Sequence, residues 1–357
     1  MMRFARRLLS ALVTILCCPV AALADSTSLL SQANAANPTR YQFAVNNNAE
    51  IRNTSDNKAF TIWWQPSTGT PAGVLVTLHG HGSYASDEFY LWQPYLQAKG
   101  YAILALQWWF GGGETVADYY QPHEMYPIIA SLLKEKGVQP GTVLLHGYSR
   151  GSANSYAVTA LDTSSGNRYI NMTLSNAGGA AADFPPNQQI AAGALGVSPF
   201  SGIQWVMYCG ELDPDPTING CPAMTAAKSW VTQYGATVKL LIDDPNGGHG
   251  GFMLSSSNVT TALNQFVPSP RTPTDTSTAD CLFNWAEKAF AQYFAPAGSA
   301  SQNSTPYRYR YYAGTGNYLA SNAADNHIWA LGTATGGQLL DLGPAAGFLG
   351  SAGCSAP

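Results

Sequence analysis

Short apolar runs alternate with longer amphipathic stretches between about residues 59 and 267. Most of these runs are apolar at every position, which is typical of strands buried on both faces of a parallel sheet. They predict strands at 59–65, 73–78, 101–108, 142–146, 172–175, 203–208 and 238–243. The intervening stretches predict helices at about 84–98, 121–136, 151–161, 222–233 and 258–267. Strands that alternate with helices indicate an α/β domain with a mostly parallel sheet.

The chain before residue 59 does not follow this pattern. Residues 1–24 contain three arginines, an apolar run and Ala22-Leu23-Ala24, which together predict a secretory signal peptide cleaved before Asp25. A membrane anchor is disfavoured because the apolar run is short and contains Pro19. Residues 25–58 are irregular, and we expect antiparallel edge strands there.

The chain also changes character after residue 267. Residues 268–279 are rich in Pro, Ser and Thr and predict a linker between a domain at 25–267 and a small module at 280–357. In this module we expect a helix at 281–294 and strands at 307–312 and 318–320. A module of this size has little core, so a disulfide would help to stabilise it.

Four cysteines remain after the predicted cleavage, namely Cys209, Cys221, Cys281 and Cys354. An even number in an exported chain indicates disulfides. Three pairings are open, and proximity along the chain favours Cys209–Cys221 with Cys281–Cys354. A metal site is not expected because no C-x-x-C pair or histidine cluster accompanies these cysteines.

The net charge and its distribution along the chain limit which classes of partner are expected. The formal net charge is −4, and it becomes more negative by three when the arginines of the signal peptide leave. No block of Lys or Arg is present, which disfavours nucleic acid as a partner. No later stretch is long and apolar enough to span a bilayer. We therefore expect a monomer that is secreted or periplasmic and has no membrane partner after cleavage.

The segment Gly147-Tyr148-Ser149-Arg150-Gly151 matches the G-x-S-x-G pattern. An apolar strand precedes it and a helical stretch follows it, which is the context in which this pattern forms a sharp turn that exposes a nucleophilic serine. The flanking glycines avoid clashes at that turn. We interpret Ser149 as a nucleophile.

A serine hydroxyl needs a base, and the base needs a carboxylate that orients it. His249 lies in a Gly-rich loop after the last predicted strand of the domain, where the base is expected. Asp213 follows the preceding strand and is the favoured acid. Asp215 is the main rival, and Glu211 ranks third.

Two backbone N–H groups should bind the oxyanion. Arg150 follows the nucleophile and supplies one, and His81 in the segment His79-Gly80-His81-Gly82 is the candidate for the other. Trp108 and Trp109 follow a strand on the same sheet edge. They line a substrate pocket or are buried under the loop.

Together these motifs resemble the α/β-hydrolase superfamily over about residues 40–267. The segments LHGHG, GYSRG, GELDP and GGHGGF occur in that family's order. The resemblance implies an eight-stranded, mostly parallel sheet with helices on both faces, acyl-enzyme chemistry and no cofactor. It is nearest to the branch of dienelactone hydrolases, prolyl oligopeptidases and polyester depolymerases. The tail resembles a C-terminal module on unrelated exported bacterial proteins, through DCLFNWAEKAF and YRYRYYAGTGNYL.

The expected function is hydrolysis of a small-molecule or polymeric carboxylic ester. One alternative is a serine peptidase or amidase that uses the same three residues. Another is a binding protein on an inactive hydrolase scaffold, which an intact triad disfavours.

Overall fold

The computed structural model describes residues 25–66, 69–196, 198–270, 277–294, 300–304, 307–322, 327–352 and 354. The predicted signal peptide at 1–24 and the central part of the predicted linker, 271–276, lie outside the described residues. In the part that is described, no helix has both the length and the apolar character needed to cross a membrane.

An eight-stranded sheet forms the centre of the larger unit, in the order β1-β2-β4-β3-β5-β6-β7-β8. Neighbouring strands from β4 to β8 are parallel, whereas β2 is antiparallel to both β1 and β4. The strands are Glu50–Asn53 (β1), Phe60–Trp64 (β2), Val74–Leu78 (β3), Ala102–Leu106 (β4), Val143–Tyr148 (β5), Ile170–Asn176 (β6), Gln204–Gly210 (β7) and Thr237–Asp244 (β8). From β2 to β6 almost every strand residue is buried, as the uninterrupted apolar runs predicted.

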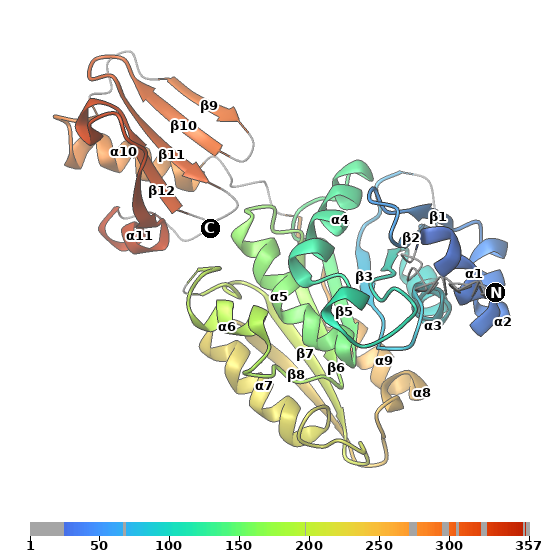
Figure 1. Ribbon diagram of the computed structural model, residues 1–357. Helices are drawn as coiled ribbons and strands as arrows, with labels where there is room; N and C mark the ends of the chain where they lie inside the picture. The colour runs from blue at the N-terminus through green and yellow to red at the C-terminus, as the bar shows by residue number, and fades with distance from the viewer. Residues whose placement is uncertain are drawn as a thin grey trace, which may run out of the picture.

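Helices cover both faces of this sheet (Figure 1). One face carries α4, α5, α6 and α7, and the other carries α3, α8 and α9. Their bounds are Ala85–Lys99 (α3), Pro122–Glu135 (α4), Arg150–Ser164 (α5), Pro185–Ala191 (α6), Cys221–Gln233 (α7), Gly251–Leu254 (α8) and Ser256–Leu263 (α9). The strand order and the two helical layers are those of the α/β-hydrolase fold, so the predicted fold class is confirmed.

The expectation for residues 25–58 was largely wrong. Two helices, α1 (Ser26–Ala36) and α2 (Pro38–Asn46), occupy most of this segment, and β1 is its one strand. Asp25 accepts a hydrogen bond from the backbone of Ser28, and Asn37 accepts one from the backbone of Arg40. These caps satisfy N–H groups at both helix starts in a segment that has few apolar positions.

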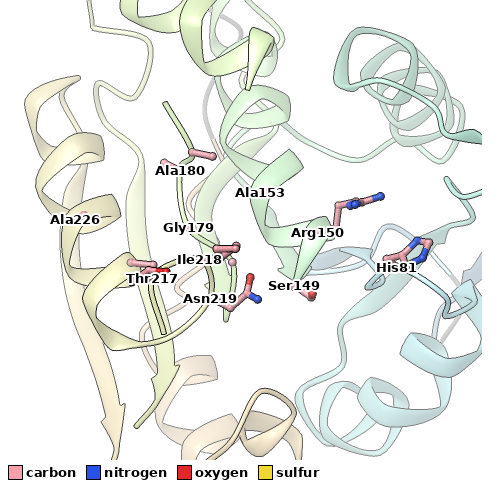
Figure 2. A pocket seen from close by; sticks show the side chains of 13 residues that line it. His81, Ser149, Arg150, Ala153, Gly179, Ala180, Thr217, Ile218, Asn219 and Ala226 are labelled. Atoms are coloured by element: carbon pink, nitrogen blue, oxygen red, sulfur yellow. The ribbon is translucent and has the colours of Figure 1, made fainter. Parts of the chain in front are cut away.

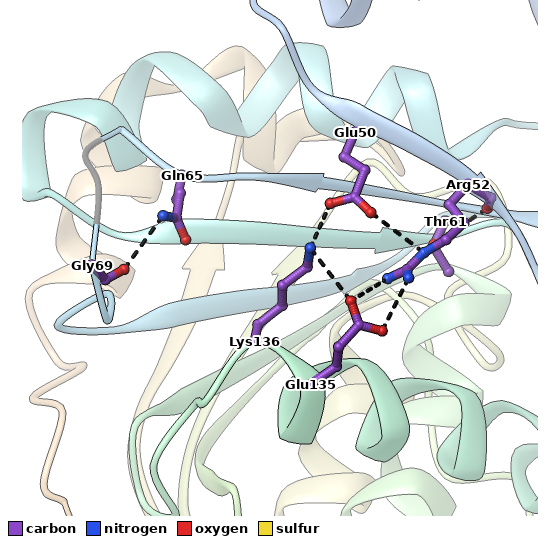
Figure 3. Close-up of polar contacts among 7 residues, drawn as sticks. All are labelled: Glu50, Arg52, Thr61, Gln65, Gly69, Glu135 and Lys136. Atoms are coloured by element: carbon purple, nitrogen blue, oxygen red, sulfur yellow. Dashed lines mark hydrogen bonds and ion pairs between the residues drawn. The ribbon is translucent and has the colours of Figure 1, made fainter.

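The edge strand β1 is covered by charge (Figure 3). Arg52 donates two hydrogen bonds of 3.0 Å to Glu135, which ends α4. Lys136 pairs with both Glu50 and Glu135. Each exposed pair adds little stability, but a charged edge discourages a second chain from adding to the sheet.

The tail contains a separate antiparallel sheet in the order β13-β12-β11-β10-β9. Its elements are α10 (Ser277–Ala289), β9 (Ala300–Ser304), β10 (Tyr307–Tyr312), β11 (Asn317–Asn322), β12 (His327–Leu331), β13 (Leu340–Pro344) and α11 (Ala346–Ala352). The two predicted strands appear as β10 and β11, and the predicted helix starts and ends earlier than expected. Leu282 and Phe283 of α10 pack with Tyr312, Leu319 and Ile328 of the sheet. The domain boundaries at 267 and 280 remain a prediction.

Both favoured cysteine pairings are present in the structure. Cys209 is bonded to Cys221, and Cys281 is bonded to Cys354. The first disulfide joins the end of β7 to the start of α7, and the second joins α10 to the segment after α11.

Candidate active site

Ser149 lies at the turn between β5 and α5, at the carboxyl edge of the sheet. Its backbone has φ 55° and ψ −119°, a conformation that is strained for a residue with a side chain. A Cβ on Gly147 would clash with the carbonyl of Gly151, and a Cβ on Gly151 would clash with the carbonyl of Leu78. The turn therefore requires both glycines of the G-x-S-x-G pattern.

The structure brings Ser149, His249 and Asp213 together in one chain of hydrogen bonds. His249 Nε2 lies 2.8 Å from Ser149 Oγ, and His249 Nδ1 lies 2.7 Å from Asp213 Oδ2. The Asp213 side chain is fully buried, whereas that of His249 keeps about a quarter of its surface exposed. A buried carboxylate on Nδ1 fixes the tautomer in which Nε2 can accept the serine proton.

The geometry distinguishes the three candidate acids. Among the described residues, no hydrogen bond or ion pair joins Asp215 to His249. The backbone N–H of Asp215 instead donates to Asp213 Oδ1 at 2.9 Å, which helps to orient the acid. Glu211 interacts with Asp243 instead, and that neighbouring carboxylate raises the pKa of Glu211. Asp213 is therefore the carboxylate that is placed to orient His249.

The loop after β3 is braced by His79, which is fully buried. Its Nδ1–H donates to the carbonyl of Gly80 at 2.7 Å, and its Nε2 accepts from the backbone N–H of Trp108 at 3.4 Å. Burial lowers the pKa of His79 to about 4, so the ring is neutral and suits both contacts. This bracing holds the backbone of Gly80 and His81 beside the turn that carries Ser149.

A polar cluster that the sequence did not reveal surrounds the side chains of His81 and Arg150. His81 Nδ1 lies 2.8 Å from the hydroxyl of Tyr119, and His81 Nε2 lies 3.2 Å from Glu114. The Arg150 guanidinium also bonds the Tyr119 hydroxyl, stacks over the Tyr119 ring and lies 3.9 Å from Glu114. Glu114 and Tyr119 thereby fix the two residues whose backbone N–H groups are the oxyanion candidates.

Ser149 opens into a pocket with a volume of about 400 Å³. Seven of its 13 lining residues are glycine or alanine, and these small side chains leave the space free. Figure 2 shows Arg150 and His81 on one side of Ser149, with Ile218 and Asn219 on the other. Thr217, Ile218 and Asn219 belong to the same loop as Asp213, so one segment supplies both the acid and a wall of the pocket.

The two tryptophans do not line the pocket that holds Ser149. Trp108 is fully buried, stacks on His79 and donates from Nε1 to the His79 carbonyl at 3.0 Å. Trp109 contacts the ring of His81 and donates to the carbonyl of Gly113 at 3.3 Å. Both therefore support the loops at the rim, and Trp108 also lies at the wall of a second compartment next to this pocket.

One group of candidate metal ligands occurs among the described residues. Cys209, Cys221 and Asp243 place donor atoms within 4.8 Å of one another. Because the two sulfurs are joined in a disulfide, they are not available as thiolate ligands.

The pocket walls were not predicted from the sequence. Gly178, Gly179, Ala180 and Ala181 follow β6, and Ala223 and Ala226 lie on α7. Thr217–Asn219 could have been noted, since they follow the favoured acid within a few residues. The glycines and alanines among these wall residues have no reactive or polar side-chain group, so no sequence motif indicates them.

Comparisons with known proteins return structural likeness alone. No family model matches the sequence, and a search of curated proteins found no match. A carboxylesterase from Mesorhizobium loti is 15% identical, with a TM-score of 0.45, covering 61% of this chain and 98% of the other. An esterase from Pyrobaculum calidifontis is 12% identical, with a TM-score of 0.47, covering 67% and 90%. A bacterial heroin esterase is 15% identical, with a TM-score of 0.47, covering 68% and 90%.

Proposed function

We propose that this protein is a serine hydrolase that cleaves carboxylic esters through an acyl-enzyme on Ser149. The observation that carries the proposal is the hydrogen-bond chain from Ser149 Oγ through His249 to Asp213. It occurs at a strained turn, next to an open pocket. A packed histidine or a solvated serine would not need this arrangement.

In this mechanism Ser149 Oγ attacks the ester carbonyl while His249 Nε2 takes its proton. The backbone N–H groups of Arg150 and His81 bind the oxyanion that develops. His249 then gives the proton to the departing alcohol, and Asp213 stabilises the imidazolium in between. A water molecule, activated by His249, cleaves the acyl-enzyme by the same steps and releases the acid.

We further propose that the protein acts outside the cytoplasm. The sequence of residues 1–24 supports export, and two disulfides suit an oxidising compartment. The pocket beside Ser149 has a volume of about 400 Å³, which has room for a small ester or for the end of a polymer chain. As a more specific form of this proposal, the ester is a polyester, and residues 280–357 form a module that holds the polymer.

A hydrolysis panel tests these statements. Wild type and Ser149→Ala are compared on short p-nitrophenyl esters, polyester film and peptidyl amides. Ester cleavage by wild type that Ser149→Ala abolishes supports the proposal. Cleavage of amides but not of esters would instead indicate a serine peptidase or amidase. A folded wild type that cleaves none of these substrates and does not react with a fluorophosphonate would refute the proposal. Removal of the residues after Val267 should lower the rate of polyester-film hydrolysis and leave the rate on soluble esters unchanged.

A further inference from the structure

A second compartment lies directly beside the pocket of Ser149. Its volume is about 390 Å³, and it shares Arg150, Ala153 and Ala181 with that pocket. Its other walls come from the segment after β4, from α5 and from the start of α6. An ester held at Ser149 can therefore extend across these three shared residues into the second compartment.

Asn154 is the feature that marks this compartment as a binding site. It lies in α5, lines the compartment and is only 5% exposed. The hydroxyls nearest to it on α5 have partners, since Ser152 and Tyr156 donate to the carbonyl of Gly178 and Ser155 donates to that of Ser152. Within the described residues, no hydrogen bond reaches the side-chain amide of Asn154.

The amide atoms of Asn154 are not among the fully enclosed polar atoms that lack a partner, so they still reach the solvent of the compartment that the residue lines. A ligand group that replaces this solvent must supply the hydrogen bonds that water would otherwise make. The amide offers two donors and one acceptor toward the compartment. A purely aliphatic group placed there would leave it unpaired. A group with hydroxyls, which both donate and accept, would satisfy it.

The charged side chains around the compartment are of both signs, and the guanidinium of Arg150 already lies 3.9 Å from Glu114, so they favour a ligand without a net charge. Arg150 borders it with a guanidinium, whereas Glu114 and Asp183 border it with carboxylates. An anion would meet the two carboxylates, and a cation would meet the guanidinium. A neutral, polar group avoids both repulsions.

We infer that this compartment binds a neutral, hydroxyl-bearing part of the ester, and that Asn154 determines this specificity. The inference rests on the proposed ester hydrolysis and adds the class of substrate. Tyr119 and Phe184 supply apolar surface for the carbon skeleton, and the Asn154 amide bonds a hydroxyl. The preferred substrates are thus esters of hydroxylated alcohols or of hydroxy acids.

The test compares esters that differ only in hydroxyl groups. One pair is 2,3-dihydroxypropyl butyrate against propyl butyrate, which places the hydroxyls in the alcohol. The other is propyl 3-hydroxybutyrate against propyl butyrate, which places one in the acid. Rates from a pH-stat give kcat/KM for each, and the ratio within a pair is the readout. One well-formed hydrogen bond predicts a preference of about 3- to 10-fold for the hydroxylated ester in at least one pair.

Asn154→Leu should bring that ratio close to one, because leucine has nearly the same shape and no hydrogen-bonding group. Asn154→Ser, which keeps a polar group but shortens its reach, should lower the ratio as well and serves if the leucine variant does not fold. The matched control is Asn171→Leu. Asn171 is a buried asparagine that donates to the carbonyl of Val267 and lines neither compartment. It should lower stability and keep the wild-type ratio.

Two results would overturn the inference. One is a wild-type ratio near one in both pairs; the other is a preference that survives in a folded Asn154 variant. In either case propyl butyrate would still be cleaved in a Ser149-dependent manner, so the proposed function would stand. Failure to cleave any ester would instead count against the proposed function itself.

Discussion

Replacing Cys209 and Cys221 by alanine removes the covalent tie across the base of the loop that carries Asp213. The two cysteines are 12 positions apart, and closing a loop of that length in the unfolded chain corresponds to about 3 kcal/mol of stability. Cys281 and Cys354 are 73 positions apart, for which the same relation gives about 4.5 kcal/mol. The tail disulfide is thus expected to contribute more stability than the disulfide of the loop.

Loss of the Cys209–Cys221 disulfide should lower the catalytic activity more than loss of the Cys281–Cys354 disulfide. The loop keeps its backbone bonds from Glu211 to Asp244 and from Leu212 to Gly247, so Asp213 is loosened rather than lost. We expect kcat on a soluble ester to fall by roughly tenfold, compared with about 10⁴-fold when a triad acid is neutralised. KM should rise as well, because the same loop lines the pocket. The double alanine variant of Cys281 and Cys354 should keep the wild-type kcat and KM.

The assay measures thermal unfolding and steady-state hydrolysis of a p-nitrophenyl ester for both double variants. Rates are taken well below the lower midpoint, so that unfolded protein does not contribute. Wild-type kinetics in the variant without Cys209 and Cys221, or an equal loss of kcat in the tail variant, would contradict this prediction. Mild reduction of wild type, followed by reoxidation, should reproduce the loss and its recovery.

Three further predictions concern single residues. Ser149→Ala should lower kcat by roughly 10⁴- to 10⁶-fold with an unchanged circular dichroism spectrum, and retention of ester turnover would exclude it as the nucleophile. Asp213→Asn should lower kcat by about 10⁴-fold because the tautomer of the base is no longer fixed, while Asp215→Asn should change it less than threefold; equal losses would contradict the assignment of the acid. Burial raises the pKa of Asp162 to about 6, so the folded protein binds this proton more tightly than the unfolded chain. Stability should therefore decrease by up to about 3 kcal/mol as pH rises from 4 to 6 and then level off. Urea unfolding at several pH values should show this contribution in wild type and its absence in a folded Asp162→Asn variant.

Much of the α/β unit could be predicted because its signals are local. Strands such as Val74–Leu78 are apolar throughout, and a parallel sheet buried on both faces demands that pattern. The turn at Ser149 has its own signature, since a side chain at Gly147 or Gly151 would clash with backbone. Asp213 and His249 could then be placed by their order along the chain.

The parts that were missed depend on contacts between distant segments. The helix α2 buries only Ala44, so it shows no apolar stripe, and the caps that start α1 and α2 are single polar residues in a polar segment. Glu114 lies in an exposed Gly-rich stretch, and only the folded chain brings it to His81 and Arg150. The alanines of the pocket matter through the space that they leave, which a linear pattern does not record.

The loop between β7 and α7 has a consequence for redesign of the pocket. This one short loop carries both the acid, Asp213, and three residues of the pocket wall, Thr217, Ile218 and Asn219. A substitution that changes the wall can therefore also displace the acid. Ala223 and Ala226 face the same pocket from the regular helix α7, which is anchored on its strands independently of the base. In directed evolution toward a new ester, we therefore expect most tolerated substitutions on α7. A substitution in the loop between β7 and α7 should be tolerated only together with a second, compensating substitution in the same loop.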